Sequence, residues 1–77
     1  MIRDVTGDDI QIGGKWFHPM KGAMTKKEAL KAAEGLRKRY GVGARVIFRE
    51  RGMFCTVGKG KTRRWVPFRG YVAFRGE

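Results

Sequence analysis

The sequence predicts an α+β domain in which one amphipathic helix packs on a small antiparallel sheet, in the approximate order ββαβββ. Two patterns carry this prediction: apolar residues recur at helical spacing over residues 25–40, and they alternate with polar residues in several segments after residue 43. Hydrophobic residues make up 42% of the 77-residue chain, which is enough for one packed core. We therefore expect residues 1–77 to form a single small basic domain.

The first part of the chain predicts a short β-hairpin. Residues 10–12 and 15–17 are mostly apolar, and Gly13-Gly14 between them suits a tight turn. Pro19 and Gly22 bound the next segment, which we expect to be a loop that leads into the helix.

Residues 25–40 carry the clearest signals for a helix. Thr25 and Glu28 have the spacing of a capping box, in which the Thr25 side chain accepts from the Glu28 amide while Glu28 reaches back to the Thr25 amide. Gly41 is placed to take the left-handed conformation that ends a helix. The predicted buried stripe consists of Ala29, Ala33, Leu36 and Tyr40, with Leu30 beside it.

After the helix, the apolar residues repeat at every second position, which indicates strands. Residues 44–49 are predicted to turn Ala44, Val46 and Phe48 towards the core. Arg51-Gly52 then predicts a two-residue turn into a partner strand over residues 53–57, in which Phe48 lies opposite Cys55. The outer face of this hairpin would hold Arg45, Ile47, Arg49, Phe54 and Thr56.

The last third of the chain predicts a charged turn and one or two further strands. Residues 58–61 form a flexible cationic turn, and residues 62–66 form a strand that Pro67 ends. The direction of Trp65 depends on the length of that turn and stays open. Residues 68–75 alternate again, as a fourth strand or a docked tail. Phe68, Val72 and Phe74 would lie on one side of it, and Arg69, Tyr71 and Arg75 on the other.

The charge of the chain indicates a polyanionic partner. Lys and Arg number 18 against 7 Asp and Glu, a net charge of +11, and residues 59–75 contain no acidic residue. Arginines neutralise phosphates and release counterions, while Phe54 or Tyr71 can stack on an unpaired base. The candidate residues for binding nucleic acid or another partner are Arg45, Arg49, Arg51, Phe54, Lys59, Lys61, Arg63, Arg64, Arg69 and Tyr71.

Each part of this candidate surface also has a purely structural interpretation. The basic face of the hairpin can be a solvated sheet face, whose long side chains prevent edge-to-edge aggregation. The turn over residues 59–64 can be a soluble hairpin tip.

Other kinds of chemistry have little support in the sequence. Cys55 is the only cysteine and is predicted to face the core, so we expect neither a disulfide nor a nucleophile. His18 has no catalytic partner, and one His with one Cys cannot supply the ligands of a zinc site. No segment reaches the roughly 20 apolar residues of a membrane span. We expect no enzymatic activity, metal, cofactor, small-molecule substrate or membrane partner, and a reducing cytoplasm as the compartment.

The order of the predicted elements resembles that of small phage-encoded anti-CRISPR inhibitors, namely the basic α+β type that acts on type I-F surveillance complexes. The resemblance covers residues 25–66: a capped helix, a glycine, a strand, a tight turn, a strand, a charged turn and Arg64-Trp65-Val66, with the spacing from Gly43 to Val66. It implies a stoichiometric inhibitor that docks where target DNA would lie on a guide-RNA nucleoprotein, in the cytoplasm of a bacterial host. No shared motif assigns individual contacts, so no site residue is carried over.

Two functional hypotheses from different classes follow. In the first, the chain is a phage or mobile-element module that binds DNA or RNA through its phosphate backbone, without strong sequence specificity. In the alternative, the same basic patch docks on an acidic protein or a nucleoprotein complex. A structural ribosomal protein ranks third, because the usual long basic tails are absent.

Overall fold

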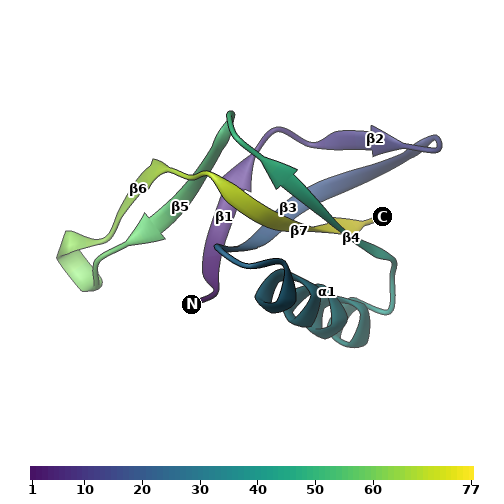
Figure 1. The fold of residues 1–77 in the computed structure, drawn as a ribbon, viewed down its shortest axis with the longest axis horizontal. Helices are drawn as coiled ribbons and strands as arrows, with labels where there is room; N and C mark the ends of the chain where they lie inside the picture. Colours follow the sequence, from purple (N-terminus) through teal and green to yellow (C-terminus); the bar gives the residue numbers. More distant parts are fainter.

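In the computed structural model, which describes residues 1–77, one α-helix packs on an antiparallel sheet of 7 strands (Figure 1). This confirms the predicted α+β class, although the strands outnumber those predicted. The elements in chain order are β1 (Arg3–Gly7), β2 (Ile10–Ile12), β3 (Lys15–Ala23), α1 (Lys26–Tyr40), β4 (Ala44–Arg49), β5 (Met53–Val57), the short 3-10 helix η1 (Gly60–Thr62), β6 (Arg64–Pro67) and β7 (Gly70–Gly76).

The sheet has the strand order β4-β7-β3-β1-β5-β6, and β2 also pairs with β3. The expected hairpin of β2 and β3 is confirmed, because Gly13 (φ 57°) and Gly14 (φ 81°) adopt the left-handed conformation between paired Ile12 and Lys15. The loop predicted for residues 19–22 is wrong. β3 continues through this segment to Ala23, and the register with β7 shifts between Pro19 and Lys21, where a missing amide proton is tolerated.

The predicted hairpin of residues 44–49 with 53–57 does not form, so the pairing of Phe48 with Cys55 is wrong. β4 instead pairs with β7, where Phe48 lies opposite Tyr71, and Cys55 lies opposite Val5 of β1 and Val66 of β6. In this arrangement only Ala44 of β4 is buried, and Phe48, which was predicted to face the core, is 46% exposed. Ile47, which would have been exposed on the outer face of the hairpin, packs against the larger core.

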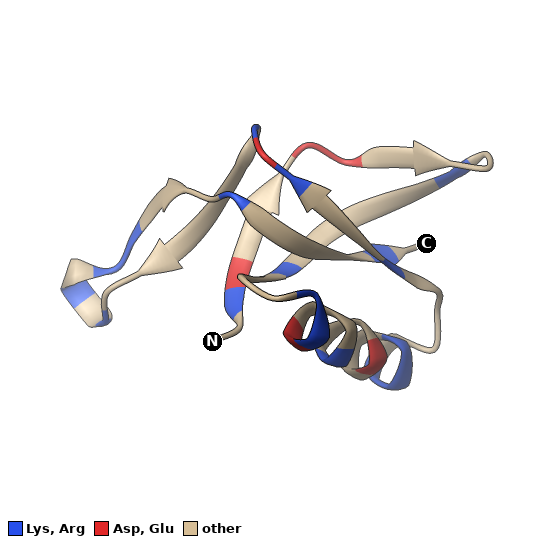
Figure 2. Cartoon of the chain, viewed as in Figure 1, with Lys and Arg blue, Asp and Glu red and all other residues tan.

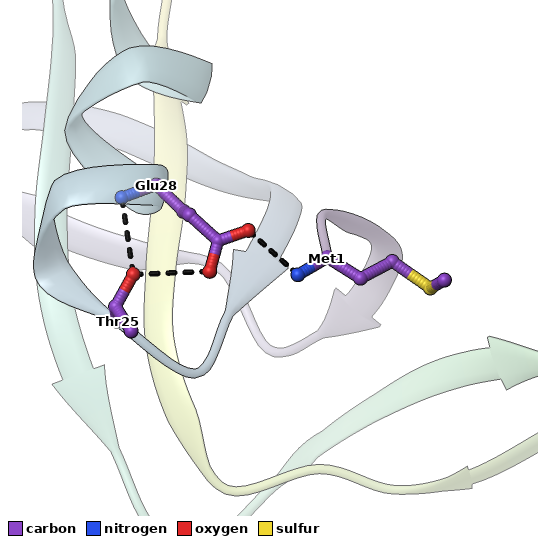
Figure 3. Close-up of polar contacts among 3 residues, drawn as sticks. All are labelled: Met1, Thr25 and Glu28. Atoms are coloured by element: carbon purple, nitrogen blue, oxygen red, sulfur yellow. Dashed lines mark hydrogen bonds and ion pairs between the residues drawn. The ribbon is translucent and has the colours of Figure 1, made fainter.

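Helix α1 begins and ends at the predicted residues, and Figure 3 shows the contacts at its start. The Thr25 side chain accepts a hydrogen bond from the Glu28 amide (3.3 Å), and Gly41 (φ 66°) closes the helix. The Glu28 carboxylate differs from the expectation, since it accepts from the Thr25 hydroxyl (3.0 Å) and from the amino terminus of Met1 (2.6 Å). A charged amine is a stronger donor to a carboxylate than a neutral backbone amide, and the contact with the amine is the main cause of the lowered pKa of Glu28.

The buried stripe of the helix is shorter than predicted. Ala29, Ala33 and Leu36 are buried, whereas Tyr40 is 39% exposed. The ring of Tyr40 instead lies 4.6 Å from the Arg75 guanidinium, a cation–π contact that holds the end of the helix against β7.

Two apolar clusters lie on opposite faces of β7, which confirms its predicted alternation. Val72 and Phe74 point into the larger cluster and Ala73 into the smaller one beneath the helix. The larger cluster consists of Val5, Phe17, Met53, Cys55, Phe68, Val72 and Phe74. Cys55 is therefore buried, as its predicted orientation required. With both faces covered, and paired with β4 on one side and β3 on the other, β7 is an inner strand of the sheet and not a docked tail.

Candidate nucleic-acid interface

The basic outer face predicted for residues 44–57 is divided in the structure. Arg45 and Arg49 lie on β4 at one edge of the sheet, on the same face as Ile47. Phe54 lies on β5 towards the opposite edge, and it alternates along the strand with the buried Met53 and Cys55, so it points away from the core. The guanidinium groups of β4 and the ring of Phe54 therefore do not form one surface.

β5, η1 and β6 together form a two-stranded extension, residues 53–67, which we call the basic arm. It projects from the end of the molecule opposite to the β2–β3 hairpin (Figure 1). Its tip has a defined conformation, because the Thr62 hydroxyl donates to the Lys59 carbonyl (2.7 Å) and accepts from the Lys59 amide (3.1 Å). Gly58 (φ 85°) has a left-handed backbone there, and a Cβ on it would lie only 2.4 Å from the Thr62 carbonyl oxygen. The ordered tip leaves the side chains of Lys59 and Lys61 exposed.

Two aromatic rings lie on the outward face of the basic arm. Trp65 is 51% exposed and Phe54 is 43% exposed. The register places Trp65 opposite Thr56 and Phe54 opposite Pro67, so the two aromatic residues are diagonal neighbours on adjacent strands. In such a pair the Cα atoms are about 7–8 Å apart. The outward direction of Trp65 is the feature of this surface that the sequence left open, since it depends on the length of the turn that η1 completes.

An acidic residue beside the arm is neutralised by two cations. Asp4 on β1 accepts a hydrogen bond from the Lys21 ammonium, and its other carboxylate oxygen lies 3.6 Å from the Arg63 guanidinium. The hydrogen bond from Lys21 is the main reason why the pKa of Asp4 is lowered. Arg3 Nη1 donates to the Thr56 carbonyl oxygen (3.1 Å), which holds β1 against the arm. The negative charge nearest to the arm is thus already compensated within the molecule.

Two of the other predicted site residues are engaged in internal contacts. Arg69 forms an ion pair with Glu50 (3.0 Å), and its guanidinium lies 5.9 Å from the centre of the Phe48 ring. Tyr71 is half-buried, and its ring meets that of Phe48 edge-on at 5.2 Å. Tyr71 is therefore packed as a cross-strand aromatic pair, on the helix side of the sheet, and not with the aromatic residues of the arm.

The three remaining predicted arginines, Arg45, Arg49 and Arg51, also lie apart from the arm. Arg51 is exposed in the connection between β4 and β5. Arg45 lines the largest hollow of the surface, about 480 Å³, together with Lys15 of the β2–β3 hairpin and the acidic Glu77. Of the ten predicted residues, the structure gathers Phe54, Lys59, Lys61, Arg63 and Arg64 on the basic arm.

Most of the positive charge has no acidic partner. Among the 18 Lys and Arg residues, the four in ion pairs with carboxylates are Lys21, Lys38, Arg63 and Arg69, which leaves 14 without one. Figure 2 shows Lys and Arg residues on the helix, on the strands and at the tip of the arm. The charge is therefore spread over the molecule, and on the arm it accompanies two exposed rings, Phe54 and Trp65, that share one face.

The only histidine, His18 on β3, lies between two acidic residues, Asp9 and the C-terminal Glu77. His18 Nδ1 lies 2.9 Å from Asp9 Oδ1, and Nε2 lies 3.2 Å from Glu77 Oε1. The hydrogen bond with Asp9 is the main cause of the raised pKa of His18. These contacts tie the β1–β2 connection and the C-terminal residue to β3.

No three His, Cys, Asp or Glu side chains come close enough together to hold a metal ion. The single α-helix is too short and too polar to cross a lipid bilayer. Comparisons with models of protein families, with curated proteins and with solved structures find no match to this chain.

Proposed function

We propose that this chain is a small nucleic-acid-binding module that contacts the phosphate backbone through the basic arm, without strong sequence specificity. The observation that carries the proposal is the composition of the arm. Lys59, Lys61 and Arg64 are exposed and lack acidic partners, and Arg63 lies between them beside a neutralised carboxylate. Long flexible cations on an ordered turn suit the repeated charges of a phosphate backbone.

Binding of this kind depends steeply on salt. Each cation that neutralises a phosphate releases condensed counterions, so affinity falls with added salt in proportion to the number of contacts. Phosphate contacts carry no sequence information directly, which is why we propose a module that tolerates many sequences. We infer that its compartment is the cytoplasm, in a bacterial host if the gene is carried by a phage.

The test is a titration of labelled single-stranded DNA, duplex DNA and RNA at about 50 and 200 mM salt. The double variant Lys59→Glu/Lys61→Glu should weaken binding strongly. Lys26→Glu/Lys27→Glu is the matched control, because it makes the same change of charge in the exposed first turn of α1. Weak binding to all three nucleic acids, or an equal loss in both double variants, would contradict a site on the arm.

The anti-CRISPR-like alternative, a stoichiometric inhibitor that docks on a nucleoprotein, would use the same arm. The half-exposed Trp65 favours it, since Trp and Arg are enriched among the residues that dominate the binding energy of protein interfaces. If this alternative holds, free nucleic acids bind weakly, and an intact guide-RNA complex retains the wild-type protein but not the Lys59→Glu/Lys61→Glu variant.

A further inference from the structure

The outward face of the basic arm combines two exposed aromatic rings with a cationic tip. Phe54 and Trp65 are the large apolar residues of this face, and neither ring has an aromatic or cationic partner within the molecule. Phe48, another exposed ring of the sheet, is instead engaged by its edge-on contact with Tyr71. Trp16 is also exposed and has no such partner, but it lies on the β2–β3 hairpin, away from the cationic tip (Figure 1). The two rings of the arm are therefore free to accept a planar partner.

We infer that the nucleic acid bound by the arm is single-stranded, with unpaired bases stacked on Trp65 and Phe54. This inference rests on the proposed function and specifies its ligand. Aromatic side chains stack on the flat faces of successive bases in a single strand. Inside a duplex, the faces of the bases are covered by the neighbouring base pairs and are inaccessible. The diagonal spacing of the two residues on one flat surface provides two adjacent stacking positions.

The arrangement of charge on the arm supports the same ligand. The strand that carries Trp65 begins next to Arg63 and Arg64, and the turn before it carries Lys59 and Lys61. Arg64 lies opposite Val57 and alternates with Trp65, so its side chain belongs to the other face of the ribbon. The cations that can guide a backbone towards the two rings are therefore Lys59 and Lys61 of the tip, which are exposed. The ion pairs of Asp4 remove the charge that would repel phosphates from the base of the arm.

A two-stranded ribbon can also enter the major groove of a duplex, where its side chains contact the edges of the base pairs. Ribbons that read a duplex present polar side chains to the base edges. The outward face of the arm presents Phe54, Thr56, Trp65 and Pro67, of which only the threonine is polar. This composition favours stacking over hydrogen bonding to base edges.

The experiment measures fluorescence anisotropy of labelled oligo-dT, oligo-rU and a duplex, each about 16 nucleotides or base pairs long, which covers the usual site size. Trp65→Ala should weaken binding of the single strands by about 5- to 150-fold, and Trp65→Phe should restore most of it. The comparison of oligo-dT with oligo-rU shows which backbone is preferred. Trp16→Ala is the matched control, because Trp16 is 46% exposed and belongs to the β2–β3 hairpin at the other end of the molecule (Figure 1).

The outcomes separate this inference from the function on which it rests. Salt-dependent binding that prefers the duplex, or that falls equally in Trp65→Ala and Trp16→Ala, would overturn the single-strand assignment and leave the nucleic-acid module intact. Absence of salt-dependent binding to any of the probes would overturn both. Far-ultraviolet circular dichroism and thermal unfolding of each variant establish that a loss of binding does not come from unfolding.

Discussion

Gly22 of β3 lies where there is no room for a side chain. A Cβ at this position would be 2.5 Å from Val5 Cγ2 and 2.8 Å from Phe68 Cζ, both of which belong to the larger core. Gly35 on the exposed surface of α1 is the opposite case, since a Cβ there would meet nothing within 4 Å. The two glycines therefore have different physical reasons for their presence, and the same substitution should affect them in opposite directions.

We expect Gly22→Ala to lower the free energy of unfolding by about 1–3 kcal/mol, because the added methyl group overpacks the core. Gly35→Ala should raise it by about 0.5–1 kcal/mol, because glycine is a poor helix former. Urea unfolding of both variants measures these changes. A stabilising Gly22→Ala would mean that Val5 and Phe68 move apart at little cost.

The contacts of His18 predict how stability depends on pH. Its pKa in the folded protein is raised above the ordinary value of 6.5, chiefly by the hydrogen bond with Asp9. While Asp9 and Glu77 are ionised, the protonated ring therefore stabilises the fold fully below that value, and this contribution is lost as the pH rises through the pKa of the folded state. Nuclear magnetic resonance titration of the ring should show a lower pKa in Asp9→Asn. An unchanged pKa would contradict the assigned cause.

At the scale of single residues, the predicted burial is correct for part of the core, whereas Tyr40 and Phe48, which were predicted to face the core, are 39% and 46% exposed. Cys55 and the apolar residues of β7 face the core as their alternation required. Trp65 could not be assigned, because its direction follows from the six residues between β5 and β6 and not from its own neighbours. Tyr71 was predicted to be available for stacking, and the cross-strand contact with Phe48 that engages it depends on a strand pairing the sequence did not reveal.

Among the elements, those with local signals were predicted correctly. The helix and the β2–β3 hairpin carry their own start and stop residues, such as Thr25, Gly41 and Gly13-Gly14. The β4–β5 hairpin was wrong although Gly52 does adopt a left-handed conformation (φ 77°), because a turn residue fixes a change of direction and not the partner of a strand. The partner of β4 is β7, which begins 21 residues after β4 ends and is itself buried on both faces.

The capping contact at the start of α1 can be tested directly (Figure 3). Thr25→Ala removes the acceptor of the Glu28 amide and should lower the free energy of unfolding by about 1 kcal/mol. Thr25→Ser keeps the hydroxyl and should be nearly neutral. Urea unfolding followed by circular dichroism measures both. Equal losses in the two variants would show that the methyl group of Thr25, and not the hydrogen bond, accounts for its effect.

On the scale of the whole molecule, the net charge of +11 opposes folding, because a compact chain brings like charges together. Added NaCl should therefore raise the thermal midpoint, as the Debye length falls from about 30 Å at 0.01 M to about 8 Å at 0.15 M. A gain of about 1 kcal/mol corresponds to about 4–8 °C for a domain of this size. A midpoint that falls with salt would show that the ion pairs outweigh the repulsion.

A charge-neutralising variant provides the control for this salt effect. Lys26 and Lys27 lie in the first turn of α1, where the helix dipole also disfavours cations. Lys26→Gln/Lys27→Gln should be more stable than the wild type at low salt, and its thermal midpoint should rise less when salt is added. Differential scanning fluorimetry across the same salt series measures both effects.

The burial of Cys55 makes the opening of the arm measurable in the unmodified protein. The thiol lies between Val5 and Val66, so a thiol-specific reagent reaches it only when β5 separates from a neighbouring strand. The labelling rate gives the free energy of the opening that exposes Cys55. If this free energy equals that of complete unfolding, the arm opens only with the rest of the fold. If it is smaller, the arm opens alone. A nucleic acid that holds both strands of the arm would slow this labelling about 100-fold at a concentration 100 times its Kd.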